Sequence, residues 1–381
     1  MKISYQWLKE FVPLDVTPQT LADELTMKAA EVETVAQQGQ GIDKVVVGEI
    51  LDIKPHPQST KLQLTKVSVG EDILDIVCGA RNIRVGQKVP VALLGARLPE
   101  MKIEARTIRG QASEGMLCSP AELGMTGGVD GILILDNNAK VGTDIKTLLG
   151  MDDAVLDLKV LADRSYLLSH VGVARDVAAI RGQQLLIENY GRPGADAITG
   201  SKTANPHAPN VLDPTLCPRY SCVALSNLRI AASPAWLASR LERLGIRPVN
   251  NLVDLTNYVM LELGQPLHAF DRTKLSGSKI FVRTAKPAER LACLDGATRE
   301  LSSETLVIAD QQQVLAVAGV IGGAASEINA QTSGALIESA NFQPRSVRRT
   351  AQRLKLRTEA SGRYERGVDY NPDRRRARPP D

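Results

Sequence analysis

Leu62-Gln63-Leu64-Thr65-Lys66-Val67-Ser68-Val69 has the two-residue alternation of a β-strand, and it lies in a longer strand-like region that begins at Val45. Further short runs of this kind follow, separated by Gly, Pro and Asn turns, at residues 73–78, 88–94, 103–108 and 132–135. Five or six short strands within about a hundred residues are typical of a small barrel. The sequence therefore predicts an OB-fold β-barrel over residues 41–150.

Helical patterns flank the predicted barrel on both sides. Before it, Thr17 is placed to cap a helix and Pro18 suits the first helical position. After it, residues 171–180 have the spacing of a helix. We expect residues 1–40 and 151–190 to form one small N-terminal α/β domain, which the barrel interrupts.

The rest of the chain divides into a linker, a larger unit and a tail. Residues 191–210 are rich in Gly, Pro, Ala, Asn and Thr without periodicity, which predicts a linker. Residues 211–370 form an α/β unit whose first helix is predicted to begin with Ser233 as N-cap and Pro234 at the first position. Residues 371–381 are a basic tail. The predicted fold class is α+β multidomain.

Composition limits the class of protein. The chain has 381 residues, which suits two or three domains, and 43% of them are hydrophobic. The net charge of +3 does not by itself indicate a nucleic-acid partner. The five cysteines form no metal-binding spacing and are expected to be reduced thiols. The longest apolar stretch is Gly-broken and too short for a membrane helix, so we expect no membrane contact and a cytoplasmic location.

Two series of motifs carry a resemblance to a known family. The first series comprises His56-Pro57, Lys61-Leu62, Ile76-Val77-Cys78-Gly79-Ala80-Arg81-Asn82, Gly86-Gln87-Lys88-Val89 and Ser113-Glu114-Gly115-Met116-Leu117-Cys118-Ser119. The second comprises Val253-Asp254, the run from Thr256 to Asp271, Gly319-Val320-Ile321-Gly322-Gly323, Glu338, Thr358-Glu359-Ala360-Ser361 and the run from Arg363 to Asp369. In this order they resemble the N-terminal half of the bacterial phenylalanyl-tRNA synthetase beta subunit.

The resemblance implies an OB-type tRNA-binding module in the first series and, in the second, an editing domain that hydrolyses mischarged Tyr-tRNA(Phe). An apolar pocket for phenylalanine rejects the added hydroxyl of tyrosine only about a hundredfold, so a second, polar site is needed. Glu338 follows the apolar pair Leu336-Ile337 and is suited to accept a phenolic hydrogen bond from the end of a buried strand. The resemblance gives Glu338 the role of recognising tyrosine; the alternative is a solvated strand-end carboxylate.

The resemblance adds three further catalytic residues, His268, Asn257 and Gly322. A neutral His268 imidazole could orient the attacking water or bind the terminal ribose, although a lone histidine is more often structural. Asn257 could hold polar groups of the substrate or could cap a turn. Gly322 allows close approach of the backbone to the ester, although glycine pairs mostly mark tight turns. Substrate-binding positions implied by resemblance alone are Gly323, Thr358 and Ala360.

RNA contacts are expected on the predicted barrel, which has no Phe, Tyr or Trp between Val45 and Gly150. Contacts to the phosphate backbone are therefore favoured over base stacking, with a solvated charged face as the alternative. The candidate tRNA-binding residues are Lys54, Lys61, Arg81, Lys88, Arg106 and Arg109.

No metal-binding group and no nucleophile are evident, so hydrolysis would depend on an aligned water. The resemblance implies ATP and Mg²⁺ as cofactors of the full alpha/beta enzyme but none in this segment. It implies tRNA(Phe) and the alpha subunit as partners, in a heterotetramer. The rival interpretation is a non-catalytic tRNA-binding and scaffolding module. Convergence of His268, Asn257, Gly322 and Glu338 in one pocket would favour the hydrolase.

The family continues through further domains after the position of Asn371-Pro372, whereas this chain ends in Arg374-Arg375-Arg376-Ala377-Arg378-Pro379-Pro380-Asp381. We expect a truncated product, with a natural basic tail as the alternative.

Overall fold

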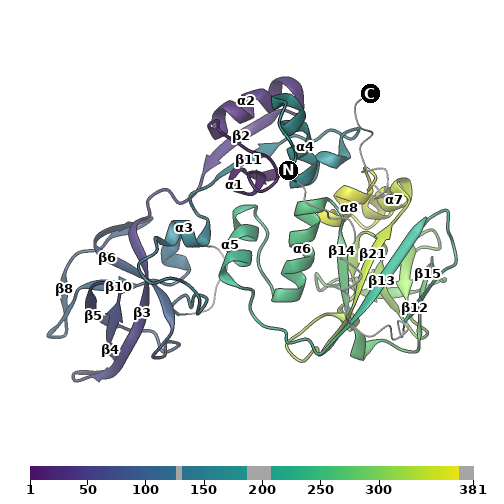
Figure 1. Ribbon diagram of the computed structural model, residues 1–381. Helices are drawn as coiled ribbons and strands as arrows, with labels where there is room; N and C mark the ends of the chain where they lie inside the picture. Colours follow the sequence, from purple (N-terminus) through teal and green to yellow (C-terminus); the bar gives the residue numbers. More distant parts are fainter. Residues whose placement is uncertain (126–130, 187–206, 369–381) are drawn as a thin grey trace, which may run out of the picture.

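The computed structural model describes residues 1–125, 131–186 and 207–368. Three bodies are visible in Figure 1: a small N-terminal unit at the top, a strand-rich unit at the lower left and a larger unit of sheets and helices at the right. Residues 191–206 of the predicted linker and the whole predicted tail, 371–381, lie outside the described residues.

The small N-terminal unit is built from two chain segments, one before and one after the strand-rich unit. Both contribute strands to one sheet, with the order β1-β11-β2. Its elements are β1 (Lys2–Ser4), α1 (Tyr5–Leu8), α2 (Pro18–Lys28), β2 (Val32–Gln37), β11 (Ala154–Leu158), the 3-10 turn η2 (Ser165–Leu167) and α4 (His170–Arg181). Thr17 caps α2 by accepting a hydrogen bond from the Thr20 N–H, and Pro18 takes the first turn. Gly182, at φ +62°, ends α4 in the left-handed conformation that glycine adopts without strain. Both helix predictions are confirmed.

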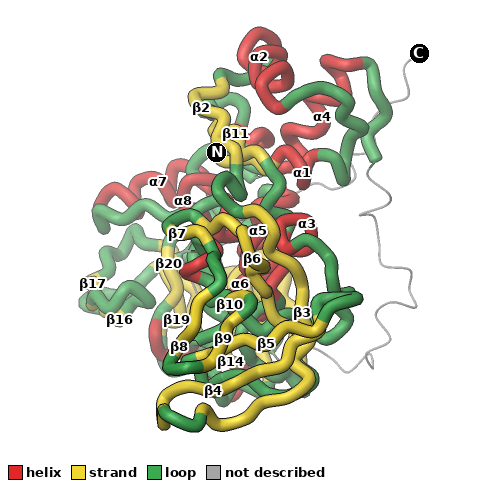
Figure 2. Tube along the Cα trace, turned by 90° about the vertical axis from the view of Figure 1, so that its left-hand side faces the viewer, coloured by secondary structure: helices red, strands yellow, loops and turns green. Residues whose placement is uncertain are grey.

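The strand-rich unit is built on a six-stranded antiparallel sheet. Its elements are β3 (Asp43–His56), β4 (Ser59–Ser68), β5 (Ile73–Cys78), β6 (Lys88–Leu98), β7 (Met101–Lys102), β8 (Arg106–Ile108), β9 (Gln111–Ser113), β10 (Gly115–Leu117), the 3-10 turn η1 (Ala121–Leu123) and α3 (Ile145–Leu149). The strand order is β10-β6-β3-β4-β5, with β7 beside β6, and β8 pairs with β9 as a separate hairpin. Figure 2 shows this unit in the foreground, with its strands in yellow.

The predicted closed barrel is not confirmed in this unit. The ladder is open between β5 and β10, where the Glu114 N–H donates to the Asp75 carbonyl at 2.9 Å without forming a paired strand. The run 103–108 is strand only from Arg106 onward, and 132–135 is not a strand. Residues 132–135 nevertheless contact the sheet, because the Leu135 N–H donates a hydrogen bond to the Lys88 carbonyl at 2.9 Å.

The larger unit contains two main sheets, with the orders β12-β15-β18-β19-β20 and β13-β21-β14. Its strands are β12 (Ala208–Val211), β13 (Arg219–Ser226), β14 (Leu267–Asp271), β15 (Lys279–Thr284), β16 (Arg290–Ala292), β17 (Thr298–Glu300), β18 (Leu306–Ala309), β19 (Val314–Val317), β20 (Ile321–Gly322) and β21 (Gly334–Asn341). Its helices are α5 (Ala235–Arg243), α6 (Asn251–Leu263), α7 (Pro344–Arg353) and α8 (Glu359–Tyr364), with 3-10 turns η3 (Arg272–Lys274) and η4 (Ala324–Ser326).

Two sequence expectations fail in this unit. Residues 208–210 of the predicted linker belong to β12, which pairs in parallel with β15. Ser233 does not cap α5, because the helix begins one residue later with Pro234 at the cap position. The Ser233 hydroxyl instead donates to the buried Asp254 carboxylate on α6, which is a partner that local sequence does not reveal.

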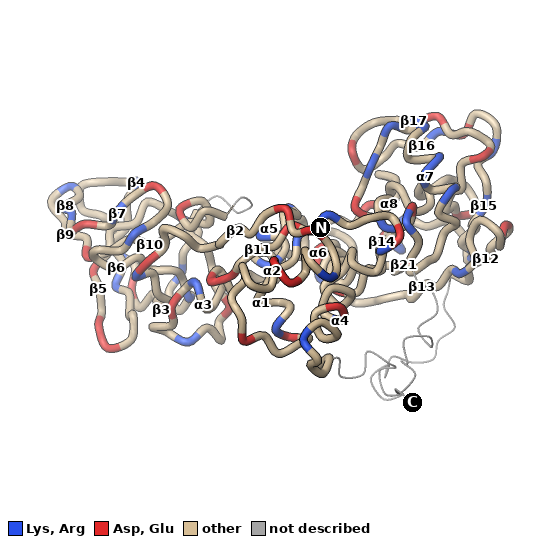
Figure 3. The backbone as a smooth tube through the Cα atoms, turned by 90° about the horizontal axis from the view of Figure 1, so that it is seen from above, with Lys and Arg blue, Asp and Glu red and all other residues tan. Residues whose placement is uncertain are grey.

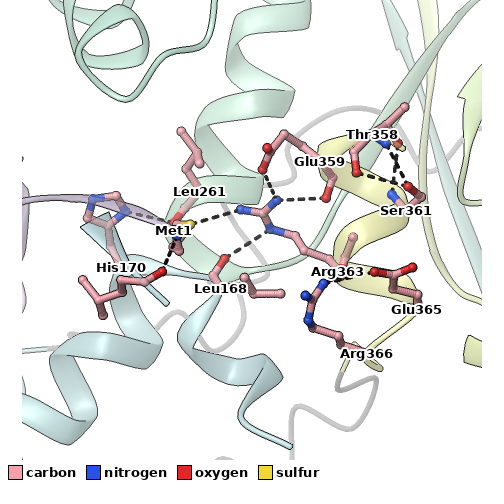
Figure 4. Close-up of polar contacts among 12 residues, drawn as sticks. Met1, Leu168, His170, Leu261, Thr358, Glu359, Ser361, Arg363, Glu365 and Arg366 are labelled. Atoms are coloured by element: carbon pink, nitrogen blue, oxygen red, sulfur yellow. Dashed lines mark hydrogen bonds and ion pairs between the residues drawn. The ribbon is translucent and has the colours of Figure 1, made fainter. Parts of the chain in front are cut away.

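Contacts with the N-terminal unit fix two helices of the larger unit. Trp7 stacks on His170 at a centroid distance of 4.0 Å and on Tyr258 of α6 at 4.7 Å. Arg363 of α8 is almost fully buried, donates to the Leu168 carbonyl at 3.2 Å and pairs with Glu359 at 2.7 Å, as Figure 4 shows. Contacts with the N-terminal unit therefore fix both helices: aromatic stacking fixes α6, and the hydrogen bond of the buried Arg363 guanidinium fixes α8. Among the described residues, no helix has both the length and the apolar character that crossing a membrane requires.

Candidate active site

A cavity of about 290 Å³ lies within the larger unit, between α6, β14, β21, α8 and the segment from β19 to β20. Six of the seven residues predicted as catalytic or substrate-binding line it: Asn257, His268, Gly322, Glu338, Thr358 and Ala360. They come from five separate segments of about a hundred residues of chain, so only the tertiary fold brings them together. Gly323 is the seventh, and it does not line the cavity.

Glu338 lies in the middle of β21, not at the end of a strand as expected. It is paired on one side with His268 of β14 and on the other with Cys222 of β13. The residue is 6% exposed, which contradicts the alternative of a solvated carboxylate. A central strand position fixes the backbone of residue 338, because it is paired with a strand on each edge.

Tyr220 of β13 is the polar partner of Glu338 that sequence reasoning missed. Its hydroxyl donates to Glu338 Oε2 at 2.8 Å, and both groups are buried. Burial raises the pKa of Glu338 to about 7, and the hydrogen bond from Tyr220 opposes that rise. Burial, together with the carboxylate of Glu338, raises the pKa of the Tyr220 phenol well above its usual value. Near neutral pH the carboxyl is thus poised between its two protonation states while the phenol stays a donor.

His268 is partly buried on the cavity wall, with its ring 4.5 Å from that of Phe270 in an edge-on contact. Burial lowers the pKa of His268 to about 4. The imidazole is therefore neutral at pH 7 and can offer one N–H donor and one ring-nitrogen acceptor.

Gly322 is required by the position of this imidazole. A Cβ atom at residue 322 would lie 2.5 Å from His268 Cε1 and 2.8 Å from Nε2, much closer than real side chains allow. The absent side chain is therefore what allows the backbone of β20 to lie against the ring. At Gly323 a Cβ would instead meet the Leu315 carbonyl oxygen at 2.6 Å, so that glycine serves packing of the strand beneath.

The side chains of the other three wall residues differ in whether they already form hydrogen bonds within the protein. Asn257 lies in the middle of α6, so it does not cap a turn, and its amide makes no hydrogen bond with another described residue. The Thr358 hydroxyl donates to the Val320 carbonyl at 2.9 Å. It also accepts from the Ser361 N–H at 3.1 Å, as Figure 4 shows. Thr358 thus shapes the wall by capping α8, whereas Ala360 contributes only a small apolar surface.

The six predicted tRNA-binding cations of the strand-rich unit are not equivalent. Lys61 and Arg106 are exposed and form no ion pair with another described residue. Arg81 and Arg109 are exposed but each donates to a nearby carbonyl, at 3.1 and 3.2 Å. Lys54 pairs with Asp52 at 3.0 Å and stays exposed.

Lys88 does not fit the predicted role. It forms an ion pair with Glu49 on the neighbouring strand, and its side chain is only 14% exposed. A lysine that is already neutralised and mostly covered has little charge to offer a phosphate.

Metal-binding groups were sought among His, Cys, Asp and Glu side chains. Within residues 1–125, 131–186 and 207–368, no three of them gather closely enough to hold an ion. All five cysteines are free thiols, four of them buried. The cavity wall combines a few hydrogen-bonding groups with apolar side chains such as Leu294 and Ile308.

Two family models match the chain, one on each of the two larger units. Residues 45–144 match "Putative tRNA binding domain", and residues 216–374 match "B3/4 domain". The fold and these matches define a mixed α+β protein that joins a tRNA-binding module to a B3/4 domain.

Curated relatives narrow the class to one family. "Phenylalanine--tRNA ligase beta subunit" of Geobacter sulfurreducens is 44% identical over 97% of this chain, and that of Moorella thermoacetica is 46% identical over the same share. The chain belongs to the family of phenylalanine–tRNA ligase beta subunits, as the resemblance predicted. It spans about half of its relatives' length, 46% in both cases.

Among solved structures, an N-terminal fragment of the phenylalanyl-tRNA synthetase beta subunit from Pyrococcus horikoshii aligns at 15% identity. The alignment covers 55% of this chain and 62% of that one, with a TM-score of 0.29.

Proposed function

We propose that the cavity of the larger unit hydrolyses the ester of tRNA(Phe) that has been mischarged with tyrosine. The observation that carries this proposal is the convergence of Asn257, His268, Gly322 and Glu338 on one cavity of about 290 Å³. A scaffold would have no need to gather a buried carboxyl, a neutral imidazole and a free amide around one hollow.

Glu338 would discriminate tyrosine from phenylalanine. Its Oε2 is taken by Tyr220, which leaves Oε1 as the acceptor for a phenolic O–H entering from the cavity. Phenylalanine would leave that buried oxygen without a partner, and an unpaired buried polar group costs about 1–3 kcal/mol. Discrimination therefore works against the substrate that lacks the hydroxyl, which an apolar synthetic pocket cannot achieve.

His268 would serve the ester and not the ring of the amino acid. As a neutral imidazole it can orient a water molecule by accepting its hydrogen bond, or donate to the terminal ribose. Asn257 faces the same space with an amide that can bind carbonyl or hydroxyl groups. The backbone of Gly322 closes the site beside the ring. Alignment of water supplies the rate, because an aminoacyl ester is already reactive.

The remaining units would deliver the RNA. Residues 41–150 would act as an OB-type module that contacts tRNA(Phe) through exposed cations such as Lys61 and Arg81. Residues 1–40 with 151–190 would form the small domain, and 211–370 the editing domain. The alpha subunit would be the protein partner, in a heterotetramer, and ATP with Mg²⁺ would serve the complete ligase.

The test is single-turnover deacylation of Tyr-tRNA(Phe) and Phe-tRNA(Phe) by the 381-residue chain. We expect the tyrosyl ester to be hydrolysed faster, with no requirement for ATP. A chain that binds the tRNA but leaves both esters at the rate of the buffer control would refute the hydrolase.

A non-catalytic tRNA-binding and scaffolding module is the second candidate, and the match of residues 45–144 to a tRNA-binding model favours it. The same assay separates the two, since the scaffold predicts binding without hydrolysis.

A further inference from the structure

A second hollow lies next to α8, at residues that adjoin those of the cavity in sequence. It has a volume of about 540 Å³ and is lined by α7, by the turn that joins α7 to α8, by the end of α8 and by Ala162 of the N-terminal unit. Figure 3 shows Lys and Arg, in blue, along α7 and α8. The groove belongs to neither of the surfaces considered so far.

The charge of this groove is one-sided. Arg348, Lys355, Arg357 and Arg366 line it, and Glu365 is the one carboxylate among the described residues of its lining. Glu365 lies between Arg357 and Arg366, at 3.4 and 3.2 Å, so it orients both guanidinium groups and neutralises only one charge. Arg348 and Lys355 are exposed and make no ion pair with another described residue. Three positive charges thus remain in excess.

Lys355 stands where glycine is usual. It follows the end of α7 with φ +51°, in the left-handed region that non-glycine side chains adopt with strain. The left-handed conformation places an exposed lysine on the lining of the groove, at a cost that glycine or asparagine would avoid.

The groove and the cavity share a wall. Arg357 lines the groove and the next residue, Thr358, lines the cavity; likewise Tyr364 lines the cavity and Glu365 the groove. A chain-like ligand whose end lies in the cavity can therefore continue over α8 with its next groups above the four cations.

We infer that this groove binds the phosphodiester backbone of the RNA strand whose 3′ end carries the ester. The inference rests on the proposed function for the identity of the strand. Guanidinium groups bind phosphate oxygens in pairs, and backbone contacts need charge without base stacking. Among the described residues that line the groove none is aromatic, and the apolar ones are Ala162, Ala351 and Leu356, which are too few for the apolar core of a protein interface.

The test compares two double variants of the 381-residue chain that each remove two positive charges from α7 or the turn after it. Arg348→Gln with Lys355→Gln removes two groove cations, whereas Arg345→Gln with Arg349→Gln removes two exposed cations of α7 that do not line the groove. Binding of unacylated tRNA(Phe) transcript is titrated against salt. Each lost single-strand phosphate contact should flatten the slope of log affinity against log salt by about 0.7. We therefore expect a change of about 1.4 for the groove variant and a much smaller one for the control. Equal slopes in the two variants would overturn the inference.

A kinetic comparison separates this inference from the proposed function. At 0.1 M salt, two lost contacts should lower kcat/KM for Tyr-tRNA(Phe) about 25-fold. Hydrolysis of 2′(3′)-O-tyrosyladenosine, which has no backbone phosphate, should be the same in wild type and groove variant. An equal loss with both substrates would mean that the substitutions damaged the cavity and would contradict a backbone site. If the wild type hydrolyses neither substrate, the proposed function fails, and the salt titration still decides whether the groove binds RNA.

Discussion

The B3/4 unit and the strand-rich unit place their functional side chains in opposite ways. In the B3/4 unit, residues from five segments converge on one cavity, and the carboxyl of Glu338 is 6% exposed. In the strand-rich unit, five of the six candidate cations are exposed, and two of the six, Lys54 and Lys88, already pair with a carboxylate. A site that discriminates tyrosine from phenylalanine by one hydroxyl depends on burial. In an exposed site, water would replace the missing hydroxyl as the hydrogen-bond partner of the carboxyl. A surface that attracts phosphate depends on accessible charge, so no single residue there is decisive.

The largest expected effect is that of His268→Ala on the rate of hydrolysis. If the imidazole aligns water or ribose, both tyrosyl and phenylalanyl esters should slow by about 10²-fold or more, in the range of general acid–base contributions. Single-turnover deacylation measures both rates, and their ratio should stay within about twofold of wild type. A variant that slowed only one ester would show that His268 contacts the amino-acid side chain instead.

Glu338→Ala should act on selectivity. Loss of a charged hydrogen-bond partner costs roughly 1.5–3 kcal/mol, or about 10- to 150-fold in the ratio of tyrosyl to phenylalanyl hydrolysis. The phenylalanyl rate has little to lose, because that substrate never made the bond. Glu300→Ala, an exposed glutamate on β17 of the same unit, is the matched control and should change neither rate. An unchanged ratio in Glu338→Ala would remove this residue from the role of discriminator.

The double variant Lys61→Ala with Arg81→Ala tests whether the exposed cations of the strand-rich unit bind RNA. We expect the slope of log tRNA affinity against log salt to flatten by one to two units, since each phosphate contact contributes about 0.7. Lys279→Ala with Arg290→Ala removes two exposed charges from the B3/4 unit as a control. A slope that both pairs leave unchanged would exclude the strand-rich unit as the surface that binds RNA.

The smallest effect is expected from Tyr220→Phe, which leaves the cavity wall in place but removes the donor to Glu338 Oε2. That hydrogen bond lowers a pKa that burial has raised to about 7, so its loss should raise the pKa further. Selectivity for tyrosine should increase with pH through about 7 in the wild type, as the carboxyl ionises, and the profile should move to higher pH in the variant. A shift of one pH unit lowers the ionised fraction at pH 7 by roughly fivefold. A profile that stays in place would mean that Tyr220 supports only packing.

The same carboxyl predicts how stability depends on pH. Glu338 has a higher pKa in the folded chain than the value of 4.5 expected when unfolded, so between the two values the folded state binds more protons. Its contribution to the free energy of unfolding is therefore fully present below about 4.5 and is lost as pH rises through about 7. As the pH rises from 5 to 8, the melting temperature of Glu338→Gln should fall by less than that of the wild type. Equal losses would mean that this carboxyl is not held at a raised pKa.

Local sequence determined much of the secondary structure and the family. Thr17, Pro18 and Gly182 act on neighbours within a few residues, so their roles as helix signals could be predicted. The motifs around His268 and Thr358 identified the family because they are long and ordered, and with it the positions that line the cavity.

The tertiary structure alone decided which groups meet. Tyr220 and Glu338 are 118 residues apart, and the strand pairing of β13 with β21 is what joins them. Lys88 is neutralised because β6 lies beside β3, and the strand pairing of the sheet leaves β5 and β10 without a ladder between them. Hydrogen-bond partners, burial and the pKa values that follow from them are properties of contacts between distant segments. The sequence could therefore name the residues of the cavity, while only the fold assigned Glu338 its phenolic partner and its raised pKa.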